Sequence, residues 1–287
     1  MRKIIISTES GADIPYKITI PYGIEVVPMH IAFGEKICND GTFQPYEIFN
    51  YYNENRKLPT TSAVNPQEYI NHFRVIFAKY PNCKIIHISY SSKLSATHQN
   101  AVIASNEFSK DKLCILDSKN VTGGTGLLVM KAAMLAQKYQ DKMSFEELTS
   151  LIRQYIGRLK CTFLPNTLDY LKAGGRISTA THLGAAVLNV KPSIVTFEGQ
   201  LISGKKYRGN ISAIAEKLFY DFVAQNNFEK ENFVIIYSYG LNVTTLFRLK
   251  RLAHKEGFKK SWCFQTGSAV SCHAGPSCVG FAGITKA

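Results

Sequence analysis

A large group of hydroxyl side chains lies in the run Tyr90 to Thr97, which holds three serines and one threonine within seven residues. It follows an apolar segment and precedes a helical one. The N-terminus of a helix leaves backbone N–H groups unpaired and carries partial positive charge, and nearby hydroxyls add neutral donors. An ordinary N-cap needs only one hydroxyl. The four together favour a binding site for a carboxylate or phosphate, with simple capping as the alternative.

Three further clusters of residues carry hydrogen-bond donors. The cluster Thr60 to Ser62 lies just before Asn65-Pro66, which is typical of a turn into a helix. In the run Leu171 to Ile177, paired glycines end a helix and are followed by Arg176, whose side chain suits two-pronged contact with anionic oxygens. A surface arginine beside a glycine cap is the plainer interpretation. The fourth group is His273 to Pro276, near the C-terminus.

Several familiar catalytic motifs are missing. The glycine-rich run Gly123 to Gly126 opens a helix, but Val129 stands where a dinucleotide-binding motif needs its last glycine, and no Lys-Ser/Thr pair follows as in a P-loop. We interpret this run as a helix entry that packs closely against its neighbours. The sequence also has neither Gly-x-Ser-x-Gly nor His-Glu-x-x-His. No nucleotide loop, serine-hydrolase elbow or zinc-protease site is therefore predicted.

The seven cysteines are an odd number and include no Cys-x-x-Cys pair, which favours free, mostly buried thiols. Cys272, His273 and Cys278 lie close together in the sequence, but a fourth metal ligand has no evident source. We expect neither a metal nor a cofactor.

Short β-rich runs alternate with segments of helical period, and this alternation predicts parallel α/β construction. The predicted strands are Lys3–Ser7, Glu25–Met29, Lys84–Ser89, Lys112–Leu116, Cys161–Leu164, Ser193–Phe197, Phe233–Tyr237 and Ser261–Gln265. The clearest predicted helices are Pro66–Lys79, Ser95–Phe108, Gly126–Gln140, Ser144–Leu159, Ile211–Gln225 and Val243–Glu256. Ser144 and Glu147 have the spacing of a capping box, which marks the start of their helix.

A chain of 287 residues with 45% hydrophobic and 19% charged residues is an ordinary globular protein of one large domain or two intimate ones. We place a boundary near residue 158, between segments 1–158 and 159–287. Because no long flexible linker marks it, we expect the two domains to share a large interface. The net charge of +13 is uneven, since the second segment has sixteen basic against seven acidic residues.

This charge suggests an anionic partner in the second segment. Nucleic acid is one alternative, but the single Trp and the lack of a recognisable motif count against it. On the predicted helix Val243–Glu256, Arg248, Arg251 and Lys255 share a face, which indicates either a solvated surface or contact with anionic lipid. The apolar runs are too short for a transmembrane helix or a signal peptide. We expect a cytoplasmic protein with peripheral contact at the inner face of the membrane.

Together and in order, the four polar groups resemble the motifs of the DegV family of bacterial fatty-acid-binding proteins. The similarity runs the whole length of the chain, from Ser7-Thr8-Glu9-Ser10 to the last motif. The matching motifs are Thr61-Ser62, the Ser-Ser-x-Leu-Ser-x-Thr run Ser91 to Thr97, the Leu-Lys-x-Gly-Gly-Arg-Ile run Leu171 to Ile177, and His273-Ala274-Gly275-Pro276. The chain departs from the family pattern at Glu9, Ala96 and His98, where Asp, Gly and Tyr are usual.

The resemblance implies two intimately packed α/β domains, a three-layer N-terminal one with a parallel sheet and a C-terminal one, with a ligand tunnel between them. It implies one long-chain fatty acid as ligand. It also implies a non-catalytic role, in which the protein presents the acyl carboxylate to a separate ATP-binding fatty acid kinase subunit that converts it to acyl phosphate.

The family's carboxylate contacts correspond to Thr61 and Ser95 first, then to His273 and Arg176, with Ser62 and Ser92 as neighbours. An enzyme is the alternative: Ser95 or Cys272 would act as a nucleophile with His273 in acyl transfer or hydrolysis. That alternative lacks an elbow motif and an assignable acid.

Overall fold

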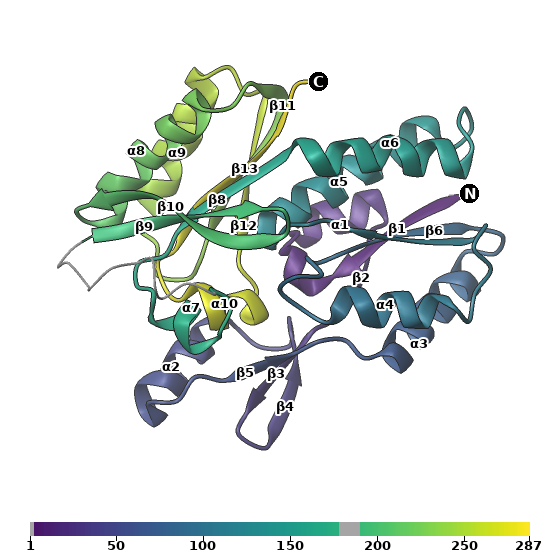
Figure 1. Cartoon of the computed structure of the whole chain (residues 1–287), viewed down its shortest axis with the longest axis horizontal. Coiled ribbons are helices and arrows are strands. Elements are labelled where there is room, and N and C mark those ends of the chain that lie inside the picture. Colours follow the sequence, from purple (N-terminus) through teal and green to yellow (C-terminus); the bar gives the residue numbers. More distant parts are fainter. Residues whose placement is uncertain (1–2, 178–189) are drawn as a thin grey trace.

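The structure is a computed structural model that describes residues 3–177 and 190–287. It contains a four-stranded sheet, a six-stranded sheet and a small three-stranded sheet. Figure 1 shows the two larger sheets side by side, with helices packed on both and the small sheet projecting from one side. The mixed α/β class predicted from the sequence is confirmed.

The four-stranded sheet is built as a three-layer sandwich. Its order is β2 (Glu25–Val27), β1 (Ile4–Glu9), β6 (Lys84–Ser89) and β7 (Leu113–Asp117), and every neighbouring pair is parallel. Because side chains alternate across a strand, Ile5 packs with helices α3 (Pro66–Lys79) and α4 (Thr97–Ser105), whereas Ile6 packs with α5 (Thr122–Tyr139) and α6 (Phe145–Arg158) on the other face. Both faces are covered, which explains the continuous apolar runs of these strands. Helix α1 (Tyr16–Tyr22) also packs against α5.

The six-stranded sheet differs from the predicted parallel construction. Its order is β10 (Gln200–Arg208), β9 (Val190–Phe197), β8 (Leu159–Leu164), β13 (Val279–Thr285), β11 (Phe228–Tyr237) and β12 (Lys260–Gln265). Of these neighbours only β11 and β12 are parallel. The parallel prediction is wrong here because β9 and β10 form a hairpin and the C-terminal strand β13 inserts between β8 and β11 in the opposite direction. Helices α8 (Ile211–Ala224) and α9 (Val243–Lys255) cover one face.

Helix α5 lies between the two larger sheets and packs on both. Its glycine-rich first turn allows this close approach. A Cβ on Gly123 would lie 2.6 Å from Ile236 Cγ1 of β11, and one on Gly126 would lie 2.8 Å from Phe264 Cε2 of β12. The interpretation of this run as a close-packed helix entry is therefore confirmed. So is the capping box at the start of α6, where Ser144 and Glu147 bond reciprocally.

The remaining elements are short, and of these only a helix ending at the paired glycines Gly174 and Gly175 was predicted. The small antiparallel sheet has the order β4 (Lys36–Asn39), β3 (His30–Phe33) and β5 (Thr60–Ser62). The short helices are η1 (Ser10–Ala12), α2 (Tyr46–Asn55), α7 (Asp169–Ala173) and α10 (Ser268–Ala274). Helix α10 contacts α2, α7, β3 and β5, so it joins segments from the two ends of the chain.

The proposed boundary near residue 158 falls between α6 and β8. One continuous apolar core includes Ile86 of β6, Met130 of α5 and Val234 of β11, and so crosses that boundary. The division into two domains stays a prediction. Within the part of the chain that is described, no helix has the length and apolar character to cross a membrane.

Candidate functional site

Five of the six predicted carboxylate-binding residues line one small cavity of about 160 Å³. Thr61 and Ser62 come from β5, Ser95 from the turn before α4, Arg176 from the segment after α7, and His273 from α10. We call this the head-group cavity. It draws on four segments separated by long stretches of sequence, and the fold alone brings them together.

Thr61 and His273 form the central contact of this cavity, with 2.9 Å between Thr61 Oγ1 and His273 Nε2. Burial, with Arg176 nearby, lowers the pKa of His273 to about 4. The imidazole is therefore neutral near pH 7 and carries a single N–H. A neutral imidazole and a hydroxyl can both donate hydrogen bonds to an anionic ligand. They do so without adding a positive charge to that of Arg176.

The Gly-Gly-Arg and His-x-Gly-Pro motifs meet at this histidine. His273 Nδ1 is buried and has no hydrogen-bond partner among the residues described. A Cβ added to Gly174 would overlap that nitrogen. Gly174 has φ −75°, which any residue adopts. The glycine is therefore required by the close approach of the imidazole and not by the backbone conformation.

Arg176 and Ser95 complete the donors of the cavity. The Arg176 Nη1 group donates to the Gly174 carbonyl at 2.6 Å, which holds the guanidinium beside the cavity wall. Ser95 Oγ accepts from the Thr97 backbone N–H at 3.3 Å, so the hydroxyl proton of Ser95 remains available to a ligand. No carboxylate side chain is among the described residues that line this cavity. One cation, hydroxyls and a neutral imidazole together favour an anion.

Ser92 is not brought to this cavity. Its side chain is exposed, and its hydroxyl donates to Asp117 Oδ2 at 2.6 Å. The cause is strand register: β6 and β7 are parallel neighbours, so Asp117 at the end of β7 lies beside the turn that follows β6 and captures Ser92. Ser91, in the same run, is buried and donates to the Gly199 carbonyl at 2.6 Å, which links the turn to the β9–β10 hairpin.

A second, apolar cavity of about 40 Å³ adjoins the head-group cavity, and the two share Tyr90, Leu94, Arg176, Val270 and His273. The sequence patterns did not single out its apolar lining. These residues are Val121, Phe163, Leu171, Leu201, Ile236, Ala274 and Cys278. Cavities that enclose whole small-molecule ligands usually measure about 300 Å³ or more. A long acyl chain would therefore enter only as these side chains move apart.

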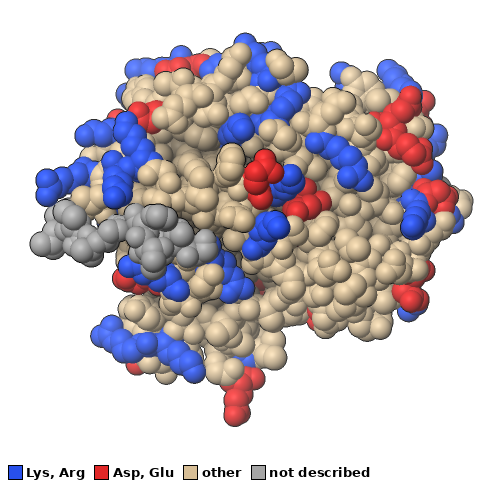
Figure 2. Space-filling model, in the orientation of Figure 1, with Lys and Arg blue, Asp and Glu red and all other residues tan. Residues whose placement is uncertain are grey.

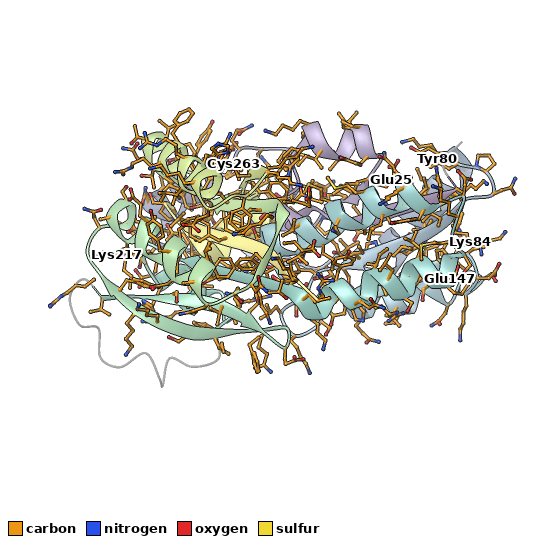
Figure 3. The ribbon with its side chains drawn as sticks, turned by 90° about the horizontal axis from the view of Figure 1, so that it is seen from above. Glu25, Tyr80, Lys84, Glu147, Lys217 and Cys263 are labelled. Atoms are coloured by element: carbon orange, nitrogen blue, oxygen red, sulfur yellow. The ribbon has the colours of Figure 1, made fainter. Side chains whose placement is uncertain are left out.

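A much larger hollow is a different feature, an open groove of about 1130 Å³ along α1. Figure 3 labels three of its lining residues. Cys263 belongs to β12 of the six-stranded sheet, and Glu25 and Tyr80 lie toward the opposite end of the molecule. Its lining also includes the buried acids Asp13 and Asp40. Because carboxylates repel a carboxylate ligand, this groove is a poorer anion site than the smaller head-group cavity.

These two acids hold helix α10 in place. Asp13 Oδ1 accepts the Gly267 N–H and Asp40 Oδ1 accepts the Ser268 N–H, both at 2.8 Å. Burial raises the pKa of both carboxyl groups, and these backbone hydrogen bonds act in the opposite direction. Negative charge at a helix N-terminus is favourable. The N-terminal half of the chain thus fixes the helix that carries His273.

Glu9 is fully buried, and both of its carboxylate oxygens have hydrogen-bond partners. Its carboxylate accepts from the Tyr69 hydroxyl and from the Tyr90 backbone N–H at 2.9 Å, and lies 3.0 Å from His87 Nε2. Burial raises the pKa of Glu9, but His87, Tyr69 and Tyr90 outweigh it and hold the pKa below its usual range. Glu9 therefore anchors Tyr90, which lines both cavities.

The geometry gives little support to nucleophilic catalysis. His273 Nε2 bonds to Thr61, and no hydrogen bond joins it to Ser95 in the described part of the structure. Cys272 is buried in the apolar core, and burial raises the pKa of its thiol to about 12, so the reactive thiolate is scarce near pH 7. The described residues contain no group of three or more His, Cys, Asp or Glu side chains placed to hold a metal ion.

Comparison with known sequences gives a full-length match. A family model described as "Uncharacterised protein, DegV family" matches residues 3–286. A DegV domain-containing protein of Caldanaerobacter subterraneus subsp. tengcongensis is 36% identical over 214 residues, which make up 75% of each chain. Another, from Clostridium acetobutylicum, is 30% identical over 290 residues and 100% of both chains.

Comparison with solved structures agrees. A fatty-acid-binding DegV family protein from Thermus thermophilus has a TM-score of 0.87 and 25% identity, with 100% of both chains covered. DegV from Bacillus subtilis, also a fatty acid binding protein, has a TM-score of 0.83 at 20% identity, again over 100% of both chains. At the lower identity the likeness concerns the fold alone.

Proposed function

The chain belongs to the DegV family, and from that premise we propose that it binds one long-chain fatty acid and acts as a non-catalytic carrier. The carboxylate lies in the head-group cavity against Thr61, Ser95, His273 and Arg176, with Ser62 at its edge. The acyl chain extends into the adjoining apolar cavity. One observation supports this proposal: the head-group cavity is rich in donors, has no carboxylate among its described lining residues, and shares five lining residues with the adjoining apolar cavity.

Estimated burial energies favour a site in which the acyl chain supplies affinity and the head-group contacts supply orientation. A C16 chain has about 14 methylenes, each contributing about 0.8 kcal/mol on burial, or about 11 kcal/mol before ordering costs. Most of the affinity therefore comes from the acyl chain. The head group needs only enough donors to be held in one orientation.

We further propose that the bound carboxylate is presented to a separate ATP-binding kinase subunit, which phosphorylates it to acyl phosphate. Two observations support this role. The sequence supplies no nucleotide loop of its own, and the residues at one edge of the head-group cavity, Ser62 and Ala96, are exposed. A partner that covers this edge would reach the carboxylate. We place the protein in the cytoplasm, with transient contact at the inner face of the membrane.

Native mass spectrometry of the protein purified from cells tests the carrier role. We expect one species heavier than the apo chain by the mass of one fatty acid, since the tunnel should retain its ligand through purification. Denaturing spectra of the same sample, which should show only the apo mass, are the control. If only apo protein is found and added oleate and palmitate fail to bind, the proposal is wrong.

Gly174→Ala tests the role of His273 in holding the head group. The new Cβ would overlap the imidazole and push it away from Thr61, so we expect oleate affinity to fall about tenfold, equivalent to about 1.4 kcal/mol. Calorimetric titration measures this. Gly157→Ala is the matched control, because Gly157 lies in a helix with nothing within 4 Å of its added Cβ. Unchanged affinity in Gly174→Ala would contradict the assigned position of His273.

A further inference from the structure

The outward face of α9 carries two large apolar side chains that nothing in the described structure covers. Val243 is 59% exposed and Phe247 is 68% exposed. They are four residues apart and so lie one above the other on the helix surface. The opposite face of the helix is fixed in the core by Thr245, Leu249 and Ala253. The helix is thus firmly held, with its first turns presenting an apolar edge to solvent.

Basic residues continue this face toward the end of the helix. Lys250, Arg251 and Lys255 are exposed, and none of them forms an ion pair in the described structure. Three other cations of this half do form ion pairs: Arg248 lies 3.4 Å from Glu216, Lys259 2.6 Å from Glu231 and Lys205 2.9 Å from Asp221. The sequence of α9 contains no acidic residue. Figure 2 shows basic side chains prevailing over the part of the molecule formed by the second half of the chain.

The loop that leads into α9 is bonded to the wall of the apolar cavity. Tyr239, just before α9 and 48% exposed, accepts the Ser277 N–H at 2.9 Å through its backbone carbonyl. Its neighbour Ser238 donates to the Gly275 carbonyl and accepts the Cys278 N–H, both at 2.7 Å. Cys278 lines the apolar cavity. The exposed face and the acyl cavity therefore share one short loop.

We propose that this face, made of Tyr239, Val243, Phe247, Lys250, Arg251 and Lys255, docks on an anionic phospholipid bilayer. The inference rests on the proposed fatty-acid binding and names the surface through which the acyl chain is exchanged. A helix with an aromatic and an aliphatic residue exposed beside lysine and arginine suits the boundary between lipid head groups and acyl chains.

A bilayer fits this face better than an acidic protein partner. The apolar residues project from the convex surface of a helix. A protein partner would need a matching groove to bury them, whereas they can insert between lipid head groups without one. Tyr239, at the edge of this face, lies in the loop that is bonded to the cavity wall, so docking would bring that end of the cavity toward the lipid. The helix α9 itself covers the other face of the six-stranded sheet. The exposed edge of the head-group cavity is instead formed by Ser62 and Ala96, in β5 and before α4.

Vesicle flotation tests the proposal. We expect the protein to bind vesicles of phosphatidylcholine and phosphatidylglycerol at 7:3, with at least tenfold weaker binding to pure phosphatidylcholine and weaker binding at 500 mM salt than at 50 mM. Val243→Ser with Phe247→Ser, and Lys250→Glu with Arg251→Glu, should each lower binding to anionic vesicles at least tenfold.

Matched controls make the same chemical changes elsewhere. Ile20→Ser removes an apolar side chain that is 73% exposed on α1, and Lys57→Glu with Lys142→Glu reverses two exposed charges. Both should bind vesicles like the wild type. Absence of binding to anionic vesicles overturns the docking proposal and would leave an acidic protein as the partner of this face. Undiminished binding by the α9 variants overturns it as well. Native mass spectra of the same samples report fatty-acid content separately, so failure of the carrier role is distinguished from failure of docking.

Discussion

Combining Thr61→Ala with Ser95→Ala is expected to reduce kinase-dependent formation of acyl phosphate by about 100-fold or more, while oleate affinity falls only about tenfold. The two hydroxyls hold the carboxylate in one orientation, and loss of a donor that positions developing charge costs about 100-fold in many enzymes. Affinity changes less because each lost hydrogen bond had replaced one to water and so contributes only about 0.5–1.5 kcal/mol net. Two such losses near the lower end of that range cost about 1.4 kcal/mol, which is tenfold, and the burial of the acyl chain is unchanged. Acyl phosphate trapped as hydroxamate gives the first quantity and calorimetry the second.

The structure supplies closely matched controls for this experiment. Ser92→Ala removes a hydroxyl from the same turn as Ser95, but its partner is Asp117 and it lies outside the cavity. Thr60→Ala makes the same change next to Thr61 at an exposed position. Both should behave like the wild type in the two assays. Equal losses of phosphorylation and of binding in the double variant would contradict the separation of orientation from affinity.

Local signals allowed some elements to be predicted to the residue. Strand β6 and helix α3 have the predicted bounds. In α3 the reason is a complete start signal, since Asn65 and Glu68 form a reciprocal capping box and Pro66 opens the first turn. In β6 it is a run of apolar residues buried on both faces of a parallel sheet.

The central strand β13 and the helix α10 escaped prediction for physical reasons. Helix α10 has seven residues and is buried on nearly all sides, so no polar face marks a helical period. Strand β13 contains Gly280 and Gly283, which weaken any strand signal. The structure explains Gly280, because a Cβ there would lie 2.7 Å from Phe163 Cβ on the neighbouring strand. Such close packing between distant segments is invisible in local sequence.

The same limit applies within the site. The run Ser91 to Thr97 correctly indicated a turn rich in donors, but four hydroxyls looked equivalent in sequence. The position of each serine hydroxyl depends on residues far along the chain. Ser91 donates to the Gly199 carbonyl, Ser92 donates to Asp117, and Ser95 lines the head-group cavity. Motif resemblance ranked Ser95 above Ser92, and of these two only Ser95 lines the head-group cavity. The roles of these residues in binding a carboxylate remain proposals.

The acyl chain should be the main source of affinity, and Leu201→Trp is designed to test this by filling the apolar cavity. Leu201 lines that cavity from β10, which is an edge strand of the six-stranded sheet. If the indole excludes about four methylenes, the loss is about 3 kcal/mol, so we expect palmitate affinity to fall about 100-fold.

The dependence on chain length separates this effect from damage to the head-group cavity. Decanoate, which reaches less far, should lose less affinity than palmitate in Leu201→Trp, whereas Thr61→Ala with Ser95→Ala should weaken both acids by the same factor. Leu201→Met, a volume-conserving change, should bind like the wild type, and circular dichroism with thermal unfolding verifies that each variant is folded. Unchanged affinity of Leu201→Trp for both C10 and C16 acids would place the acyl chain outside this cavity, because a methylene that never enters the cavity cannot be displaced from it.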